Sequence, residues 1–264
     1  MKELSTIAQA VQASTTMAID SMFKQMKADG VDVIGFGAGE PDFPTPDEIK
    51  EAGIAAIRDN YTRYTPAVGS LELRKAICGR VKADFGLSYE PSQVVVASGA
   101  KHAVYIAMRA LINPGDEVIL PAPYWVSYIE LIRIMGGVPV VIETQEADGF
   151  KITAQQLSDA ITPKTKAMIL NNPSNPTGMM YNREELEGLA QVCVEQDIYV
   201  VADEIYSCLV YDGRPFVSFA SLGEEVKKRT VLVNGFSKAY AMTGWRIGYA
   251  CANPAVAKVM ANYI

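Results

Sequence analysis

A lysine, a serine and an arginine in the last thirty residues have the types and spacing needed to hold a phosphorylated aldehyde. Lys238 follows a strand-like apolar run and stands directly after Ser237, and Arg246 lies two helical turns further along. A lysine amine can form a Schiff base with an aldehyde, whereas a serine hydroxyl and an arginine guanidinium can bind a phosphate. Pyridoxal phosphate carries both groups, so this stretch indicates a pyridoxal phosphate site.

An acidic residue after another strand-like run could serve the ring of this cofactor. The pyridine ring is the electron sink for an amino-acid carbanion, and it works best with its nitrogen protonated. Asp203 ends the run Tyr199–Asp203, and ligands of open α/β sheets bind outside such strand ends. Considered alone, an acid at this position is better explained as a helix N-cap.

The stretch Asn234–Gly248 (NGFSKAYAMTGWRIG) closely resembles the lysine motif of fold-type I, class I and II aminotransferases, in the branch that holds aspartate and aromatic aminotransferases. The resemblance extends over essentially the whole chain. It implies that Lys238 is the catalytic lysine, which carries pyridoxal phosphate as a Schiff base and then moves the substrate Cα proton as general base and acid. It also implies that Asp203 pairs with the ring nitrogen.

The same resemblance implies further contacts with the cofactor, each with a plainer alternative. Asn175 and Tyr206 would hydrogen-bond the phenolic oxygen, although Asn175 alone could be an Asx-turn residue. Trp125 would stack on the ring, and the alternative is a core tryptophan. The turn at Gly99 opens a helix whose N-terminus would bind the phosphate, although such turns are common in α/β proteins. The expected cofactor contacts are Tyr64, Gly99, Ala100, Lys101, Trp125, Asn175, Asp203, Tyr206, Ser237, Lys238 and Arg246.

Four residues are expected to contact the substrate: Gly39, Lys101, Trp125 and Asn175. Gly39 resembles the position whose backbone meets the substrate α-carboxylate, although it could simply serve a turn. Some bacterial aspartate aminotransferases bind the distal carboxylate through a lysine at the position of Lys101, and a plain surface lysine is an equal alternative. One departure from the family is Ala13, which stands where a proline usually precedes the serine.

Tyr64 matches a tyrosine that reaches the phosphate of the neighbouring subunit in related enzymes. The match predicts a homodimer whose sites are completed across the subunit boundary. The alternative is an aromatic residue in a surface loop.

Composition argues against several other functions. The 264 residues carry a formal net charge of -6 and no basic stripe, which disfavours nucleic-acid binding. No apolar run is long enough to span a membrane. Four scattered cysteines indicate free thiols of a reducing cytoplasm, and a single histidine without a C-x-x-C pair gives no metal site.

Seven short apolar runs alternating with helix-period segments predict an α/β fold of three layers, α/β/α, around a mostly parallel seven-stranded sheet. The expected helices include Ala100–Ile112, Val126–Met135, Arg183–Gln196 and one that starts after Pro254. The expected strands are Val94–Ser98, Glu117–Pro121, Val138–Ile142, Ala167–Asn171, Tyr199–Asp203, Thr230–Asn234 and Arg246–Cys251.

Residues 1–45 are expected to form an N-terminal arm and active-site segment, and residues 46–264 a large domain that binds pyridoxal phosphate. Family members continue into a smaller C-terminal domain, so we expect a truncated chain without that domain. Gly35–Pro46 and Tyr61–Gly69 are expected to be irregular.

The expected reaction is transamination between an acidic or aromatic L-amino acid and a 2-oxo acid. Another pyridoxal phosphate enzyme on the same scaffold stays open, such as a C–S lyase or an aminocyclopropane-carboxylate synthase. A truncated chain that binds the cofactor without activity is a further alternative. A nicotinamide-binding domain is disfavoured because no G-x-G-x-x-G follows an early strand.

Overall fold

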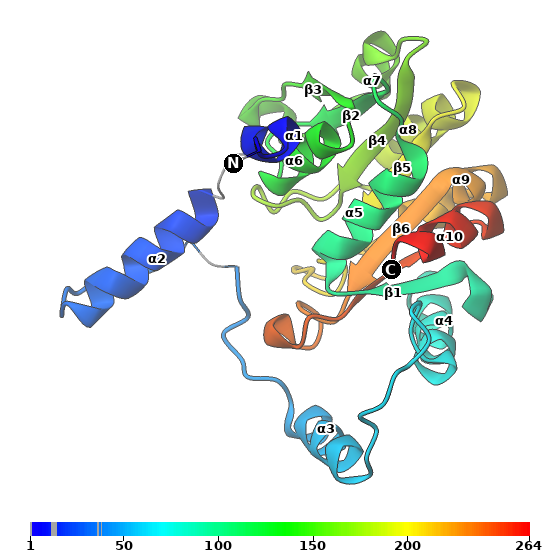
Figure 1. Ribbon diagram of the computed structural model, residues 1–264. Coiled ribbons are helices and arrows are strands. Elements are labelled where there is room, and N and C mark those ends of the chain that lie inside the picture. Colours follow the sequence, from blue (N-terminus) through cyan, green and yellow to red (C-terminus); the bar gives the residue numbers. More distant parts are fainter. Residues whose placement is uncertain (1, 12–14, 36, 38) are drawn as a thin grey trace.

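The computed structural model describes residues 2–11, 15–35, 37 and 39–264. A seven-stranded sheet runs through its centre in the order β1-β7-β6-β5-β4-β2-β3 (Figure 1). Neighbours among β2 to β6 are parallel, and β7 is antiparallel to both β1 and β6. The prediction of a mostly parallel sheet is confirmed. The strands are β1 Val94–Ala97, β2 Glu117–Pro121, β3 Val138–Ile142, β4 Thr165–Asn171, β5 Tyr199–Asp203, β6 Thr230–Gly235 and β7 Gly248–Cys251.

Helices cover both faces of the sheet and also form the N-terminal segment. The α-helices are α1 Thr6–Ala10, α2 Thr15–Ala28, α3 Asp47–Arg58, α4 Leu71–Phe85, α5 Ala100–Leu111, α6 Ser127–Ile134, α7 Ala154–Ala160, α8 Arg183–Glu195, α9 Glu224–Arg229 and α10 Pro254–Met260. Short 3-10 turns are η1 Pro91–Gln93, η2 Glu146–Asp148, η3 Phe219–Leu222, η4 Thr243–Trp245 and η5 Ala261–Tyr263.

The core divides along the two faces of the sheet. Helices α5, α6 and α10 cover one face, α7, α8 and α9 cover the other, and α4 covers that second face at β6, β7 and β1. Successive side chains of a strand point to opposite faces, so Ala167 and Ile169 of β4 join the first layer and Met168 and Leu170 the second. This alternation produces the expected three layers.

Local sequence explains where the helices begin. Asn182 caps α8 and forms a reciprocal capping box with Glu185, and Thr153 caps α7 in the same way with Gln156. Each box satisfies two backbone N–H groups at the helix start. Asn253 caps α10, in which the next residue is a proline.

The N-terminal segment contains two helices that stand away from the sheet, whereas α1 lies against α6. In Figure 1, α2 and α3 stand away from the sheet, and α3 buries none of its residues. The segment from Tyr61 to Gly69 forms neither helix nor strand, as expected. Leu4, Ile7, Ile57 and Tyr61 are exposed apolar side chains of this part of the chain.

The strand boundaries differ from the prediction by one or two residues at four ends: β1 ends at Ala97, β4 begins at Thr165, β6 ends at Gly235 and β7 begins at Gly248. The last strand begins at Gly248 rather than at Arg246, because Arg246 has φ +56 and so lies outside the extended region. The backbone of Gly248 packs against the turn at Gly99. A Cβ added at Gly248 would lie 2.4 Å from the nitrogen of Ala100. This close approach requires a glycine at the first position of β7.

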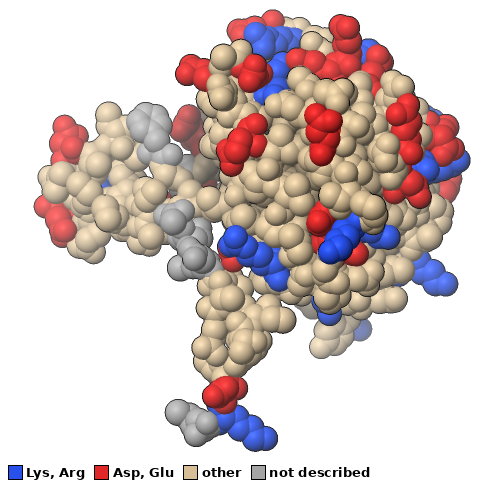
Figure 2. Space-filling model, turned by 90° about the horizontal axis from the view of Figure 1, so that it is seen from above, with Lys and Arg blue, Asp and Glu red and all other residues tan. Residues whose placement is uncertain are grey.

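Charged groups are mixed on the face shown in Figure 2, where Lys and Arg side chains lie among Asp and Glu side chains. Within the described parts of the chain, no helix is long and apolar enough to cross a membrane. The same residues contain no group of His, Cys, Asp and Glu side chains that could hold a metal ion.

Candidate active site

Three neighbouring parallel strands, β4, β5 and β6, end on the same side of the sheet. Asn171, Asp203 and Gly235 are the last residues of β4, β5 and β6, and Asn171 pairs with Asp203 in the ladder. The loops that follow contain Asn175, Tyr206 and Lys238, so the fold gathers the predicted residues at the carboxyl end of the sheet.

Asp203 is buried with only 3% of its surface exposed. The hydroxyl of Tyr128 donates to its Oδ2 (2.7 Å), and the backbone N–H of Ile205 donates to its Oδ1 (3.2 Å). Burial raises the pKa of Asp203 to about 6, although both hydrogen bonds favour the ionised form. A group that brought positive charge to this carboxylate would stabilise its ionised form.

Asn175 and Tyr206 lie together beside Asp203. The amide of Asn175 donates to the Tyr206 hydroxyl at 3.4 Å, and the backbone N–H of Asn175 donates to Asn171 Oδ1 at 2.7 Å. The Asn171 amide in turn donates to the carbonyl of Asp203 (2.9 Å). Asn171 therefore fixes the loop that holds Asn175 to the strand that ends in Asp203.

Lys238 is half-buried in the turn after β6. Its amine donates to the carbonyl of Gly39 and lies 5.7 Å from the ring centroid of Tyr206. Burial lowers the pKa of the Lys238 amine; Glu40 opposes this effect and Arg246 adds to it. A lowered pKa increases the neutral, nucleophilic fraction of the amine at a given pH.

Arg246 packs against the turn that opens α5. Gly99 has φ +86, no side chain caps α5 there, and an added Cβ would lie 2.4 Å from Arg246 Nη2. A guanidinium and a helix N-terminus are thus adjacent, which is a favourable arrangement for an anion. Ser237 is buried beside Lys238.

The interval from Lys238 to Arg246 differs from the expected two helical turns. It consists of hydrogen-bonded turns and the 3-10 segment η4, with the Met242 N–H donating to the Ser237 carbonyl. Ala241 and Arg246 both have positive φ, which no α-helix contains.

Trp125 and Lys101 lie against each other at the site. Lys101 Nζ lies 5.5 Å from the Trp125 ring centroid, within cation–π range. The Trp125 ring also meets the Tyr128 ring edge to face, with centroids 5.3 Å apart. Tyr128 therefore contacts both Trp125 and Asp203.

The Gly/Pro-rich segment lies along the lysine turn. Thr45 donates to the carbonyl of Ala241 (2.6 Å) and accepts from Trp245 Nε1 (3.2 Å), and Thr243 donates to Glu40 (3.0 Å). Gly39 belongs to the same segment, and its carbonyl accepts from the Lys238 amine. These contacts join parts of the chain that are about 200 residues apart in the sequence.

Tyr64, the remaining predicted site residue, is fully exposed. Ala13 and Ser14, which bear on the substrate segment, are outside the described residues.

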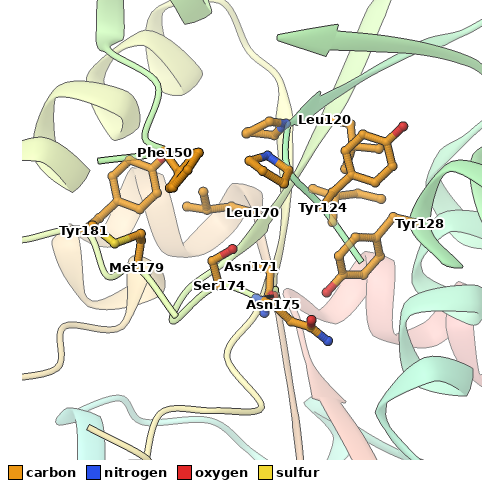
Figure 3. A pocket seen from close by; sticks show the side chains of 13 residues that line it. Leu120, Tyr124, Tyr128, Phe150, Leu170, Asn171, Ser174, Asn175, Met179 and Tyr181 are labelled. Atoms are coloured by element: carbon orange, nitrogen blue, oxygen red, sulfur yellow. Dashed lines mark hydrogen bonds between the residues drawn. The ribbon is translucent and has the colours of Figure 1, made fainter. Parts of the chain in front are cut away.

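A small cavity lies behind the Asn175 loop. Figure 3 shows Tyr124 and Tyr128 on one side of it and Phe150, Met179 and Tyr181 on the other. Its volume of about 20 Å³ is far below that of a ligand pocket. The cavity therefore belongs to the packing beneath the loop and has no room for a cofactor ring.

Sequence reasoning missed two elements of the site. Tyr128 lies three residues after Trp125, and its backbone N–H donates to the Trp125 carbonyl (3.0 Å) in the turn that opens α6, a spacing that could have been used. The contacts of Thr45 with Ala241 and Trp245 had no local signal, because they depend on the tertiary fold.

Comparison with known proteins assigns a family. The family described as aminotransferase class I and II matches residues 31–264. An aspartate aminotransferase of Bacillus sp. strain YM-2 is 50% identical over 263 residues, which are 99% of this chain and 67% of that protein. One from Bacillus subtilis is 49% identical over 96% of this chain and 64% of its own length.

Solved structures agree with this assignment. The aspartate aminotransferase of Thermus thermophilus with maleate superposes with a TM-score of 0.95 at 44% identity, covering 100% of this chain and 68% of that one. The enzyme from Rhizobium meliloti gives a TM-score of 0.94 at 42% identity, covering 100% and 66%. The chain belongs to the class I and II aminotransferases, a family of pyridoxal-phosphate-dependent enzymes, and spans about two thirds of the length of these relatives.

The residues present fit pyridoxal phosphate. The Arg246 guanidinium lies where a Cβ at residue 99 would collide with it. This guanidinium and the backbone N–H groups that open α5 are therefore adjacent donors for a phosphate. Asp203 is a buried carboxylate without a cationic partner among the described residues, and a protonated ring nitrogen would supply one. The lowered pKa of Lys238 favours the neutral amine that bonds to an aldehyde.

Proposed function

We propose that this chain is the cofactor-binding part of an aminotransferase that exchanges the amino group of an aspartate, glutamate or aromatic L-amino acid with a 2-oxo acid. The observation that carries the proposal is the placement of Lys238. Its half-buried amine lies between Tyr206 and Gly39 with a lowered pKa, at the strand ends where Asp203 is buried.

When bound, pyridoxal phosphate supplies an aldehyde for the amino group and a ring that accepts the electrons of the Cα–H bond. Arg246, Ser237 and the α5 N-terminus at Gly99, Ala100 and Lys101 hold the phosphate. Asp203 keeps the ring nitrogen protonated, and Asn175 and Tyr206 donate to the phenolic oxygen. Trp125 supports the ring face.

Lys238 performs the proton transfer in this proposal. With the cofactor bound, the free Lys238 amine would accept the proton from the substrate Cα as general base and would then donate it as general acid. Its lowered pKa favours the neutral form that acts as the base. The Tyr206 ring centroid lies 5.7 Å from this amine.

Lys101, Trp125, Asn175 and the backbone of Gly39 are proposed to bind the substrate. Lys101 is exposed with its amine directed over Trp125, a position from which it can pair with a second carboxylate. The relative from Thermus thermophilus was solved with maleate, a dicarboxylate, and others are called aspartate/prephenate aminotransferases. A dicarboxylate substrate fits both observations.

A homodimer is part of the proposal. Tyr64 is fully exposed in the single chain, so it is free to reach the phosphate in a second subunit. Mixing a Tyr64→Ala chain with a Lys238→Ala chain should restore tight cofactor binding, because one site of the mixed dimer then holds both native residues. Absence of any restoration would contradict a shared site.

We also propose a cytoplasmic location, which the four free cysteines support. The function itself is tested by the absorption spectrum of the chain with pyridoxal phosphate before and after aspartate is added. Conversion to the pyridoxamine form supports transamination. Release of pyruvate and ammonia from a cysteine conjugate, without that conversion, would indicate a C–S lyase instead.

A further inference from the structure

Glu204 is a second buried acid, directly after Asp203 in the chain. It is 2% exposed, and its side chain points to the opposite face of the sheet from Asp203, as consecutive residues leaving a strand do. Its Oε1 accepts from the Ser218 hydroxyl (3.0 Å) and from the backbone N–H of Phe219 (2.8 Å). Oε2 has no hydrogen-bond partner among the described residues.

Among the residues that the structure describes, the groups around Glu204 offer it no positive charge. Those that interact with it electrostatically are Asp203 on its own segment, Tyr89 before β1, and Tyr249 and Cys251 on β7. All four are acids, and burial raises the pKa of each. A buried carboxylate with one unsatisfied oxygen and no cation is costly, whereas a neutral carboxylic acid is much less so.

We propose that Glu204 is a positioning residue that acts as a neutral carboxylic acid, fastening the Ser218–Phe219 turn to the end of β5 while leaving Asp203 as the single negative charge there. The benefit of a neutral Glu204 for binding the cofactor's ring nitrogen at Asp203 rests on the proposed function. The protonation state and the anchoring do not, because both are properties of the folded chain. The raised pKa of Glu204, about 8 through burial, agrees with this assignment.

The sign of the pH effect follows from proton linkage. The folded chain keeps on Glu204 a proton that the unfolded chain releases above its ordinary pKa of 4.5. Stability from this group is therefore fully present below that pH and is lost as the pH rises through about 8. Glu204→Gln removes the proton but keeps an Oε1 acceptor for Ser218 and Phe219.

The experiment compares the unfolding free energy of the full chain and of Glu204→Gln from pH 5 to pH 9, with the exposed Glu187→Gln as control. The stability difference should move in favour of Glu204→Gln as the pH rises, and Glu187→Gln should show no such trend. A flat difference, or one that moves against glutamine, would mean that Glu204 is ionised and would overturn the proposal.

Carboxyl carbon NMR of the wild-type chain gives an answer that needs no variant of Glu204 to fold. The Glu204 signal should titrate far above the normal range, and Ser218→Ala should move its midpoint higher by removing a donor. A Glu204 midpoint near that of exposed glutamates would contradict the proposal.

Anchoring is read separately by amide exchange at Phe219. Exchange should be fast in Glu204→Ala and close to wild type in Glu204→Gln; equal exchange in both variants would remove the positioning role. Because none of these measurements uses the cofactor, they can fail while the proposed function stands, and the reverse is also true.

Discussion

Tyr128 donates a 2.7 Å hydrogen bond to the buried carboxylate of Asp203, and its ring meets Trp125 edge to face. One side chain on α6 therefore orients the residue expected beneath the cofactor ring and the residue expected at the ring nitrogen. The hydrogen bond favours the ionised form of Asp203 against the effect of burial, which raises its pKa to about 6.

Tyr128→Phe should raise the pKa of Asp203 further, because it removes a donor to the charged form and leaves Oδ2 without its partner. Leaving this acceptor unsatisfied should cost roughly 1–3 kcal/mol of stability. The Asp203 carboxyl titration, followed by NMR, checks the direction. Tyr124→Phe, a half-buried neighbour, is the control, and an unchanged Asp203 midpoint in Tyr128→Phe would show that the hydrogen bond does not set its ionisation.

Gly99→Ala should weaken binding of pyridoxal phosphate by about 10- to 100-fold, the loss expected when a charged hydrogen bond is broken. The new Cβ would lie 2.4 Å from Arg246 Nη2 and displace the guanidinium. Equilibrium titration with pyridoxal phosphate and with pyridoxal provides the measurement, and only the phosphorylated ligand should be affected.

Gly115→Ala is a matched control for this change. Gly115 has a similar φ of +90, but an added Cβ there meets nothing within 4 Å. Both variants therefore carry the backbone strain of a positive φ, and only Gly99→Ala disturbs Arg246. Equal losses of cofactor affinity would attribute the effect to backbone strain alone.

Most of the strands and site residues could be predicted from the sequence, and those that could not be predicted depend on tertiary contacts. The strands from Glu117 to Asp203 were predicted nearly residue by residue because buried parallel strands are continuous apolar runs. The start of β7 was missed because Arg246 has a positive φ and its side chain packs on Gly99, a tertiary contact that local pattern does not encode. Residues of the site were found through motifs, whereas Tyr128 acts through Asp203, and Glu204 contacts Ser218 and Phe219, which lie in none of those motifs.

Thr45→Val should loosen the segment that lies along the lysine turn. It removes the hydrogen bonds to Ala241 and Trp245, each contributing about 1 kcal/mol. Limited proteolysis between residues 31 and 46 should become roughly tenfold faster or more, while the unfolding midpoint of the sheet body changes little. Thr62→Val, in the exposed loop before α4, should leave the cleavage rate unchanged. A similar rate in Thr45→Val would show that these bonds do not hold the segment.

Lys101→Ala should raise the apparent KM for aspartate by about tenfold, as expected for loss of a charged hydrogen bond, and should affect phenylalanine far less. The reason is that only aspartate has a second carboxylate to pair with the Lys101 amine. The absorption change of the bound cofactor on adding each amino acid provides the measurement, and Lys82→Ala on the exposed side of α4 is the control. Equal effects on both substrates would contradict the assignment of Lys101.

The central claim is that Lys238 carries the cofactor. Its lowered pKa predicts that capture of pyridoxal phosphate proceeds with a midpoint below the ordinary lysine value of 10.5, and faster as the pH rises toward that midpoint. The most direct measurement is borohydride reduction of the loaded chain followed by peptide mass spectrometry. We expect the cofactor mass on the peptide that contains Lys238, and none in Lys238→Ala. Cofactor attached to another lysine, or equal labelling of Lys238→Ala, would contradict the account.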